Sequence, residues 1–327
     1  MSVLFGSILL YSTANLLNAF VETIPAYAFL RFVAGVGLAG ELGAAITLVS
    51  ESLPTRLRGY GTSLVAAFGI CGALLAGYVG ESFDWKVAYF VGGVLGLALL
   101  VLRVKMHESS LFANTQKDDT VKRGDLGMLL GDRGRLKRYL LCILIGIPLW
   151  YAVGLLITFS PEIAAVIGVE GEVSAGRGIL MFYAGLAVGD LTSGLISQKL
   201  QSRRGATLIF MLIAALTTGL YFFAEGFTST QFYGVCVLMG FGYGYWALFV
   251  TIAAEQFGTN LRATVAISVP NFVRGAVVPL TIIFQALGPH LGVIASAAWI
   301  GVGVFTISLL ALYAIEETFH KDLQYLE

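Results

Sequence analysis

The chain has 327 residues, of which 57% are hydrophobic and only 12% are charged, and its mean hydropathy is +0.84. Soluble domains carry about 25% charged residues, so this composition excludes an ordinary water-soluble globular protein. The 20 basic and 20 acidic residues give a net charge of zero. We therefore expect a lipid bilayer around the chain, and no nucleic-acid partner.

Ten apolar segments are long enough for membrane-spanning helices, which need about 20 mostly apolar residues each. In chain order they cover residues 3–22, 25–50, 60–80, 86–106, 139–160, 178–198, 206–224, 230–254, 264–288 and 291–315. The polar, basic stretch 107–138 separates the first four from the last six. The pattern predicts an all-α membrane protein with an N-terminal bundle over 1–106, a cytoplasmic linker over 107–138, and a C-terminal bundle with a short tail over 139–327.

Basic residues are segregated between the two sets of alternating loops. Sixteen of the 20 Lys and Arg residues fall in one set of loops and ends, and only Lys86 and Arg177 fall in the other. The remaining two, Arg31 and Arg274, lie within predicted spans. The positive-inside rule places the sixteen, and both termini, in the cytoplasm. The chain is therefore predicted to be a multi-pass protein of the inner or plasma membrane.

An internal repeat links the two bundles. Glu51 and Arg58 are seven positions apart at the end of an apolar helix, and Glu255 and Arg262 repeat this spacing 204 residues later. A repeat built from apolar helices points to a transporter with two related halves. The second half contains two spans that have no partner in the first. Either the protein naturally has ten spans or Met1 is an internal methionine of a longer protein, and the repeat favours the second interpretation.

The glycine-rich helix and the loop that follows it carry a family resemblance. The residues concerned are Arg31, Gly35, Gly37, Gly40, Glu41, Gly43, Glu51, Pro54, Arg58 and Gly59. With them the chain resembles the metabolite:proton symporter and sugar-porter branches of the major facilitator superfamily, from the third to the twelfth helix. The resemblance implies a two-bundle fold, alternating access and a central site. It also implies that Glu51, Arg58, Glu255 and Arg262 form a cytoplasmic gate or contacts between helices; the alternative is that they are solvated loop charges.

Two departures from the family pattern bear on this resemblance. Gln198 stands where the family usually has an aspartate in the loop signature, which puts that gating contact in doubt. The Gly-Pro signature of drug antiporters is missing from span 60–80, which argues against efflux.

Four charged residues inside predicted spans are candidates for substrate binding or ion coupling. They are Arg31, Glu41, Asp190 and Arg274. A charge at the centre of a span costs about 2.5–3.5 kcal/mol on insertion scales, so its presence calls for a function or a buried partner. One interpretation is that the four form structural ion pairs within each bundle. The other is that a carboxylate carries a proton while an arginine binds an anionic group of the substrate.

Three further residues are predicted to line a cavity. Tyr151 and Trp246 lie in spans that the resemblance places around the cavity, and Asn271 precedes Arg274 by three positions, on the same helix face. Packing is the alternative for each aromatic residue. Small residues four positions apart, Gly185 and Gly189 in one span and Gly240 and Gly244 in another, predict close helix packing.

Enzyme chemistry has little support. The three histidines, His107, His290 and His320, lie outside or at the edges of the spans, and no phosphate-binding loop is present. We expect no cofactor and no metal. The sequence predicts a monomeric, proton-coupled secondary active transporter of a small metabolite. The alternatives are an efflux antiporter, a non-transporting membrane sensor or scaffold, and a truncated remnant.

Overall fold

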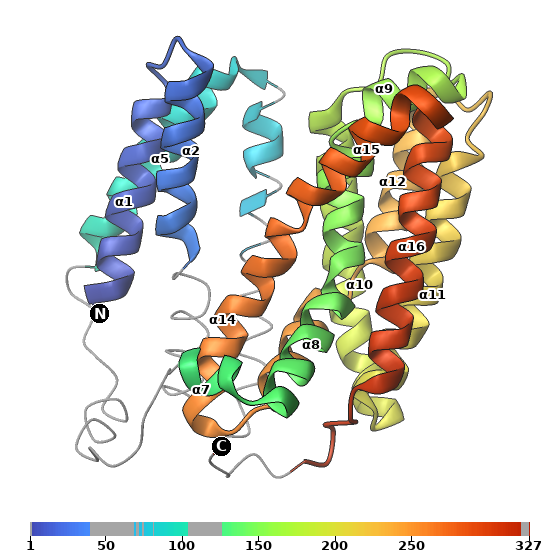
Figure 1. Cartoon of the computed structure of the whole chain (residues 1–327). Helices are drawn as coiled ribbons and strands as arrows, with labels where there is room; N and C mark the ends of the chain where they lie inside the picture. Colours follow the sequence, from blue (N-terminus) through green and yellow to red (C-terminus); the bar gives the residue numbers. More distant parts are fainter. Residues whose placement is uncertain are drawn as a thin grey trace. The chain divides into compact units, whose positions relative to one another are not determined.

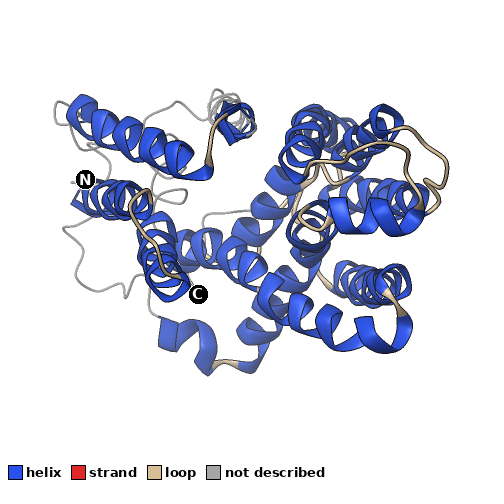
Figure 2. Ribbon diagram, turned by 90° about the horizontal axis from the view of Figure 1, so that it is seen from above, coloured by secondary structure: helices blue, strands red, loops and turns tan. Residues whose placement is uncertain are grey.

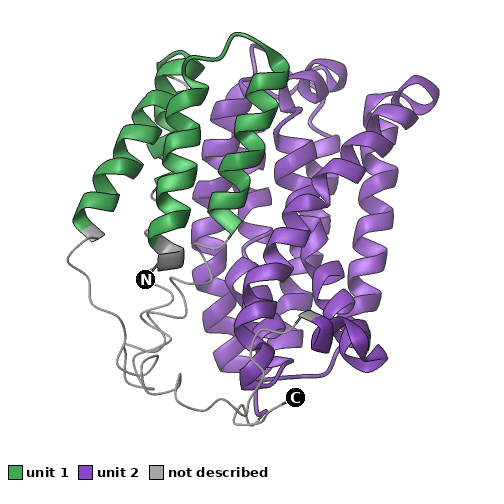
Figure 3. Cartoon of the chain, turned by 60° about the vertical axis from the view of Figure 1, so that its left-hand side comes forward, with its two compact units in different colours: residues 1–122 green, residues 123–327 purple. Residues whose placement is uncertain are grey.

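The computed structural model describes residues 2–39, 69, 72–73, 75–80, 82–103, 126–321 and 327. These residues form helices joined by turns and loops, and no strand occurs among them apart from one isolated bridge between Glu170 and Thr228 (Figure 2). The chain separates into two compact units, Met1–Lys122 and Arg123–Glu327 (Figure 3). The prediction of an all-α architecture is confirmed.

The described part of unit 1 contains α1 (Ser2–Asn18), α2 (Ile24–Ala39) and α5 (Trp85–Arg103). They overlap the predicted spans 3–22, 25–50 and 86–106, and residues 75–80 are helical inside the predicted span 60–80. Glycines bring α1 into backbone contact with both neighbours. A Cβ added at Gly37 of α2 or at Gly93 of α5 would lie 2.8 Å from a backbone nitrogen of α1.

Unit 2 contains the remaining helices (Figure 1). They are α7 (Leu126–Gly131), α8 (Arg133–Tyr151), the π-helix η1 (Ala152–Ile157), α9 (Ser160–Ile167), α10 (Ala175–Leu200), α11 (Arg203–Phe222), α12 (Ser229–Gly242), α13 (Trp246–Glu255), α14 (Thr259–Gly275), α15 (Val277–Leu291) and α16 (Val293–Ala314). The principal packing partners are α10 and α11 with α12, α16 with α8, and α14 with α8 and α13.

Seven helical segments among the described residues are long and apolar enough to cross a membrane. They are Trp85–Leu102, Arg133–Ile157, Ala175–Leu200, Arg203–Phe222, Ser229–Glu255, Thr259–Leu291 and Val293–Ala314. Each overlaps one of the predicted spans. The second begins six residues before position 139, because Asp132 accepts a hydrogen bond from the Arg135 amide (2.8 Å) and so caps a charged first turn that hydropathy does not reveal. Residues 126–131 and 133–138 of the predicted linker are therefore helical.

Pro148 interrupts the hydrogen bonding of α8. A proline has no N–H, so it cannot donate to the carbonyl four residues earlier, at Leu144. The Ser308 hydroxyl on α16 donates to that carbonyl instead, at 2.6 Å. Directly after α8 the chain widens into η1, where the Thr158 hydroxyl donates to the carbonyl of Val153 at 2.8 Å. Side chains thus satisfy the backbone groups that the irregular helix frees, as a span in lipid requires.

The α10–α12 seam is a direct backbone contact. A Cβ at Gly185 would lie 1.9 Å from the Val237 carbonyl oxygen, and one at Gly240 would lie 1.9 Å from the Phe182 carbonyl oxygen. The predicted close packing of these small residues is confirmed. One turn along, a Cβ at Gly244 would lie 2.3 Å from backbone atoms of Gly189. Only glycine allows this approach at these positions.

Two predicted spans are broken. Residues 243–245 leave the helix between α12 and α13, inside the predicted span 230–254, and Ala276 separates α14 from α15, inside the predicted span 264–288. The first break is next to the glycine contact with α10. It therefore places the start of a new helix, α13, in the interior of unit 2.

Candidate functional site

Arg274 lies near the C-terminal end of α14, between two tryptophan rings. Its guanidinium carbon is 5.4 Å from the ring centroid of Trp246 and 5.9 Å from that of Trp150. Both rings are within the range of a cation–π interaction. Asn271, one turn earlier, accepts a hydrogen bond from the guanidinium (3.0 Å) and donates one to the carbonyl of Ile267 (2.9 Å). The predicted pairing of Asn271 with Arg274 on one face is therefore present.

No carboxylate among the described residues forms an ion pair with Arg274. The rings and the amide stabilise the cation, but no carboxylate among the described residues balances its charge. The structure thus contains no Asp190–Arg274 ion pair within unit 2, which was the structural alternative for these two residues. A partly buried, unmatched guanidinium attracts an anion, and its planar donor fork suits a carboxylate.

Asp190 lies on α10 and is 9% exposed. Its carboxylate oxygen accepts a hydrogen bond from the backbone amide of Ala247, the second residue of α13, at 3.1 Å. The carboxylate thus faces the N-terminus of a helix, where unpaired N–H groups and the helix dipole favour negative charge. No other side chain of the described residues makes an ion pair or hydrogen bond with it.

Tyr151 is fully buried, its hydroxyl donates to the carbonyl of Ala297 on α16 at 2.7 Å, and it packs against Gly301. These contacts agree with the packing alternative, while its role in substrate binding stays a prediction. Tyr183 of α10, which sequence reasoning did not single out, lies within electrostatic range of the Arg274 guanidinium. The sequence could have indicated Tyr183, because it lies seven residues before Asp190 and residues at this spacing share one face of a helix.

Arg31 lies in unit 1, on α2. Its guanidinium carbon is 5.8 Å from the ring centroid of Tyr89 on α5, and the hydroxyls of Tyr27 and Tyr89 are 2.9 Å apart. One aromatic ring therefore lies against Arg31, whereas two lie against Arg274. The other predicted residues of this half, Glu41, Glu51 and Arg58, lie outside the described residues.

Glu255, at the end of α13, links two other elements. Its carboxylate is 3.5 Å from the Arg203 guanidinium at the start of α11 and accepts a hydrogen bond from the Thr318 hydroxyl at 2.7 Å. Arg262 donates to the carbonyl of Phe257 at 3.3 Å. Glu255 thus joins α13, α11 and the segment after α16. Its role as a gate stays a prediction.

Glu317, in the segment after α16, contacts the turn between α10 and α11, and this turn follows the exposed Gln198. Its carboxylate accepts hydrogen bonds from the Ser202 hydroxyl and from the amides of Arg203 (2.9 Å) and Arg204 (3.1 Å). Burial acts to raise the pKa of Glu317, but these hydrogen bonds outweigh it and lower the pKa below its usual value. A carboxylate from the C-terminal segment therefore stabilises this turn, where Gln198 carries no charge.

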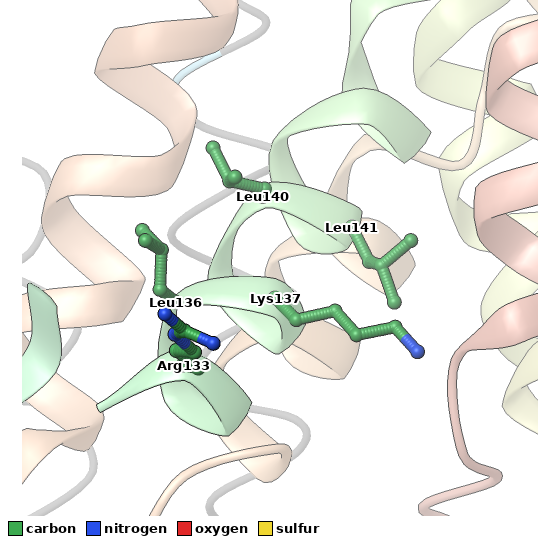
Figure 4. A pocket seen from close by; sticks show the side chains of 5 residues that line it. All are labelled: Arg133, Leu136, Lys137, Leu140 and Leu141. Carbon is green, nitrogen blue, oxygen red and sulfur yellow. The ribbon is translucent and has the colours of Figure 1, made fainter.

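A surface hollow lies at the first turns of α8 (Figure 4). Its lining residues are Arg133, Leu136, Lys137, Leu140 and Leu141. It contains none of the predicted substrate residues. The hollow is separate from the Arg274 group, whose nearest member on the same helix, Trp150, comes nine residues after Leu141.

The sequence profile of the Major Facilitator Superfamily matches residues 1–280. The chain belongs to the Major Facilitator Superfamily. This confirms the family expected from the glycine-rich helix and the Glu–Arg repeat. The transporters named among its relatives are not enzymes, and the prediction that this chain is no enzyme is confirmed at the level of the family.

Relatives within this superfamily include two bacterial transporters. The 3-(3-hydroxy-phenyl)propionate transporter of Escherichia coli (strain K12) is 29% identical over 273 residues, which cover 80% of this chain and 64% of the relative. The niacin transporter NiaP of Acinetobacter baylyi is 26% identical over 363 residues, covering 99% and 80%. The chain thus spans less than two thirds of the first relative's length.

A solved structure confirms the fold. The D-xylose-proton symporter superposes with a TM-score of 0.69 at 15% identity, covering 98% of this chain and 81% of the symporter. At this identity the likeness shows the superfamily fold alone. The predicted two-bundle fold of the superfamily is confirmed.

Proposed function

We propose that this chain is a secondary active transporter of a small aromatic carboxylate, coupled to protons and working by alternating access. One observation carries the proposal: Arg274 is a partly buried cation between two tryptophan rings, without a carboxylate partner among the described residues. The guanidinium would bind the carboxylate of the substrate, and the rings would pack against its apolar part.

The chemistry named in the relatives supports this substrate class. 3-(3-Hydroxyphenyl)propionate and niacin both combine an aromatic ring with a carboxylate, and transporters of these two compounds are similar to this chain over 80% and 99% of its length. A sugar offers no charge for Arg274. The tryptophan rings could pack against either a sugar or an aromatic carboxylate. The charge of Arg274 therefore favours the carboxylate.

Asp190 is the proposed proton carrier. Its carboxylate is buried in the interior of unit 2 and accepts a hydrogen bond from a backbone amide. It has no cationic partner among the described residues. A carboxylate held in this way can take up and release a proton without breaking an ion pair. Proton coupling also agrees with the shared fold of the D-xylose-proton symporter.

The proposed orientation places both termini in the cytoplasm of an inner or plasma membrane. The start of α8, the α10–α11 turn and the α13–α14 turn carry most of the basic residues of unit 2. Arg138 at the start of α8 donates to the Gln256 carbonyl at the α13–α14 turn (2.8 Å), and Arg203 at the α10–α11 turn pairs with Glu255. The basic ends therefore gather at one end of unit 2, as the positive-inside rule requires.

Binding and uptake by the full chain in proteoliposomes test the proposal. Benzoate, 3-phenylpropionate and nicotinate are offered beside the neutral benzamide and D-xylose. Replacing Arg274 with Ala should remove a charge-assisted hydrogen bond worth about 1.5–3 kcal/mol, and so weaken carboxylate binding roughly 10- to 150-fold. Arg274→Lys should recover part of the affinity, because it restores the charge but not the planar fork.

Arg133→Ala is the matched control, since Arg133 is an exposed arginine of the same unit and lies in the separate hollow on α8. It should bind and transport like the unchanged chain. Equal binding of benzoate and benzamide, or carboxylate affinity that survives Arg274→Ala, would refute the substrate assignment. Uptake against a gradient only in inverted vesicles would instead support efflux.

A further inference from the structure

We propose that Asp190 is a positioning residue of the Arg274 site: its carboxylate holds the start of α13, and with it the ring of Trp246. A proton on Asp190 would then alter the substrate site without any contact between the two charges. This inference rests on the proposed function, because the site that it regulates is the proposed substrate site.

The first step is the cap of α13. A helix leaves its first N–H groups without intrahelical partners, and a side-chain oxygen at the preceding residue usually accepts one of them. Tyr245 occupies that position and provides no such bond. Asp190 of α10 accepts from Ala247 in its place, at 3.1 Å. The cap of α13 therefore comes from another helix, and it is charged.

The second step leads from the cap to the site. Trp246 is the first residue of α13, next to the capped Ala247, and its ring is 5.4 Å from the Arg274 guanidinium carbon. The same ring packs against Phe249, with centroids 5.5 Å apart. Any loosening of the first turn of α13 thus displaces one of the two rings that hold Arg274.

The third step concerns what is fixed and what can move. The backbone contact between Gly189 and Gly244 fixes α10 against residues 243–245, so Asp190 is held in place by its own helix. Within the break, the buried hydroxyl of Tyr245 has no hydrogen-bond partner among the described residues. The Asp190 bond connects the first turn of α13 to this fixed helix and so constrains the direction in which α13 starts.

Other charged groups lie away from this contact. The elements packed against α10 are α9, η1, α11, α12 and α13. Their charged side chains are Glu162 in the first turn of α9, Arg203 and Arg204 at the start of α11, and Glu255 at the end of α13, while η1 and α12 carry none. Tyr183, Tyr243 and Tyr245 are the nearby phenols. None of these groups hydrogen-bonds to the Asp190 carboxylate in the described residues.

The experiment uses the full chain in lipid nanodiscs, without substrate. Its four tryptophans are labelled with 5-fluorotryptophan, and Trp246→Phe assigns the ¹⁹F resonance of residue 246. Hydrogen exchange of the peptide that contains the amides of 246–248 is measured in parallel between about pH 5 and pH 9. On acidification the Trp246 resonance should shift. The protection of these amides, taken as the ratio of the intrinsic to the observed exchange rate at each pH, should fall about tenfold, which corresponds to the loss of a helix cap.

Two variants separate the charge from the hydrogen bond. Asp190→Asn keeps an oxygen acceptor without the charge, so it should hold the resonance near its acidic position at every pH. Asp190→Ala removes the acceptor as well and should exchange fastest. Thr192→Ala, two residues along the same helix, should behave like the unchanged chain. A monodisperse elution profile for each variant shows that it has folded.

The same samples then receive benzoate. A pH-dependent benzoate affinity in the unchanged chain that becomes independent of pH in Asp190→Asn supports the inference. An unchanged Trp246 resonance and unchanged amide exchange in both Asp190 variants would overturn it, even if benzoate binds. Absence of benzoate binding with an intact Trp246 response would overturn the proposed substrate, while the positioning of Trp246 by Asp190 would stand.

Discussion

Gly185→Ala should destabilise unit 2, and the structure gives the size of the clash. The added Cβ would lie 1.9 Å from the Val237 carbonyl oxygen of α12, whereas ordinary contact begins at 3.4 Å, so the helices must separate by about 1.5 Å. The obstructing atom belongs to the backbone and cannot rotate away. Overpacking of this kind typically costs about 1–3 kcal/mol.

Gly194→Ala on the same helix is the matched control. Nothing lies within 4 Å of a Cβ at that position. Alanine in an open helix position should stabilise the chain by about 0.5–1 kcal/mol, because glycine loses more backbone entropy on folding. Thermal unfolding in one detergent should therefore give a lower Tm for Gly185→Ala and an equal or higher Tm for Gly194→Ala. Equal values of Tm for both variants and the unchanged chain would refute the backbone-contact seam.

Three further predictions concern single side chains. Tyr151→Phe should lower stability by about 1 kcal/mol through loss of the buried bond to Ala297, while carboxylate transport persists; loss of transport at full stability would return Tyr151 to the substrate site. Because the pKa of Glu317 is lowered on folding, its contribution to stability is complete above the usual value of 4.5 and disappears as the pH falls through the lowered pKa. The Tm of Glu317→Gln should thus respond less to acid than that of the exposed Glu316→Gln control, and identical acid profiles would contradict the Glu317 contacts. Asp190→Asn should abolish uptake against a gradient while exchange continues, and unchanged concentrative uptake would exclude Asp190 as proton carrier.

The apolar segments made the helices predictable, since their lengths and charges reflect the solvent that surrounds them. Hydropathy could not predict the residues at which helices begin or are interrupted. The first turn of α8 is charged and depends on a single cap at Asp132. The break before Trp246 occurs in a sequence that is apolar and glycine-rich throughout, where periodicity carries no signal.

The candidate site was predictable residue by residue but not as a set of contacts. Arg274 was identified because a charge inside a span is costly, Asn271 because it lies three positions earlier on the same helix face, and Trp246 because the family resemblance placed its span around the cavity. The structure brings these three together with Trp150. Tyr151 shows the limit of this reasoning. Its position in the chain is adjacent to Trp150, but the hydroxyl points to α16, a direction that only the packed helices determine.

The π-helix η1 also acts as an angular offset between the two parts of the span Arg133–Ile157. Each residue of an α-helix turns the chain by about 100°, and a π-turn accommodates one residue more than an α-turn. Deleting one residue within 152–157 would let the segment close into a regular α-helix. It would also rotate Trp150, which precedes the π-helix, relative to the helices that follow it, and so turn Trp150 away from Arg274 on α14. The extra residue in this turn therefore helps to position Trp150 in the site. A sequence alignment with a gap in this turn would place the residues on one side of the gap one position out of register.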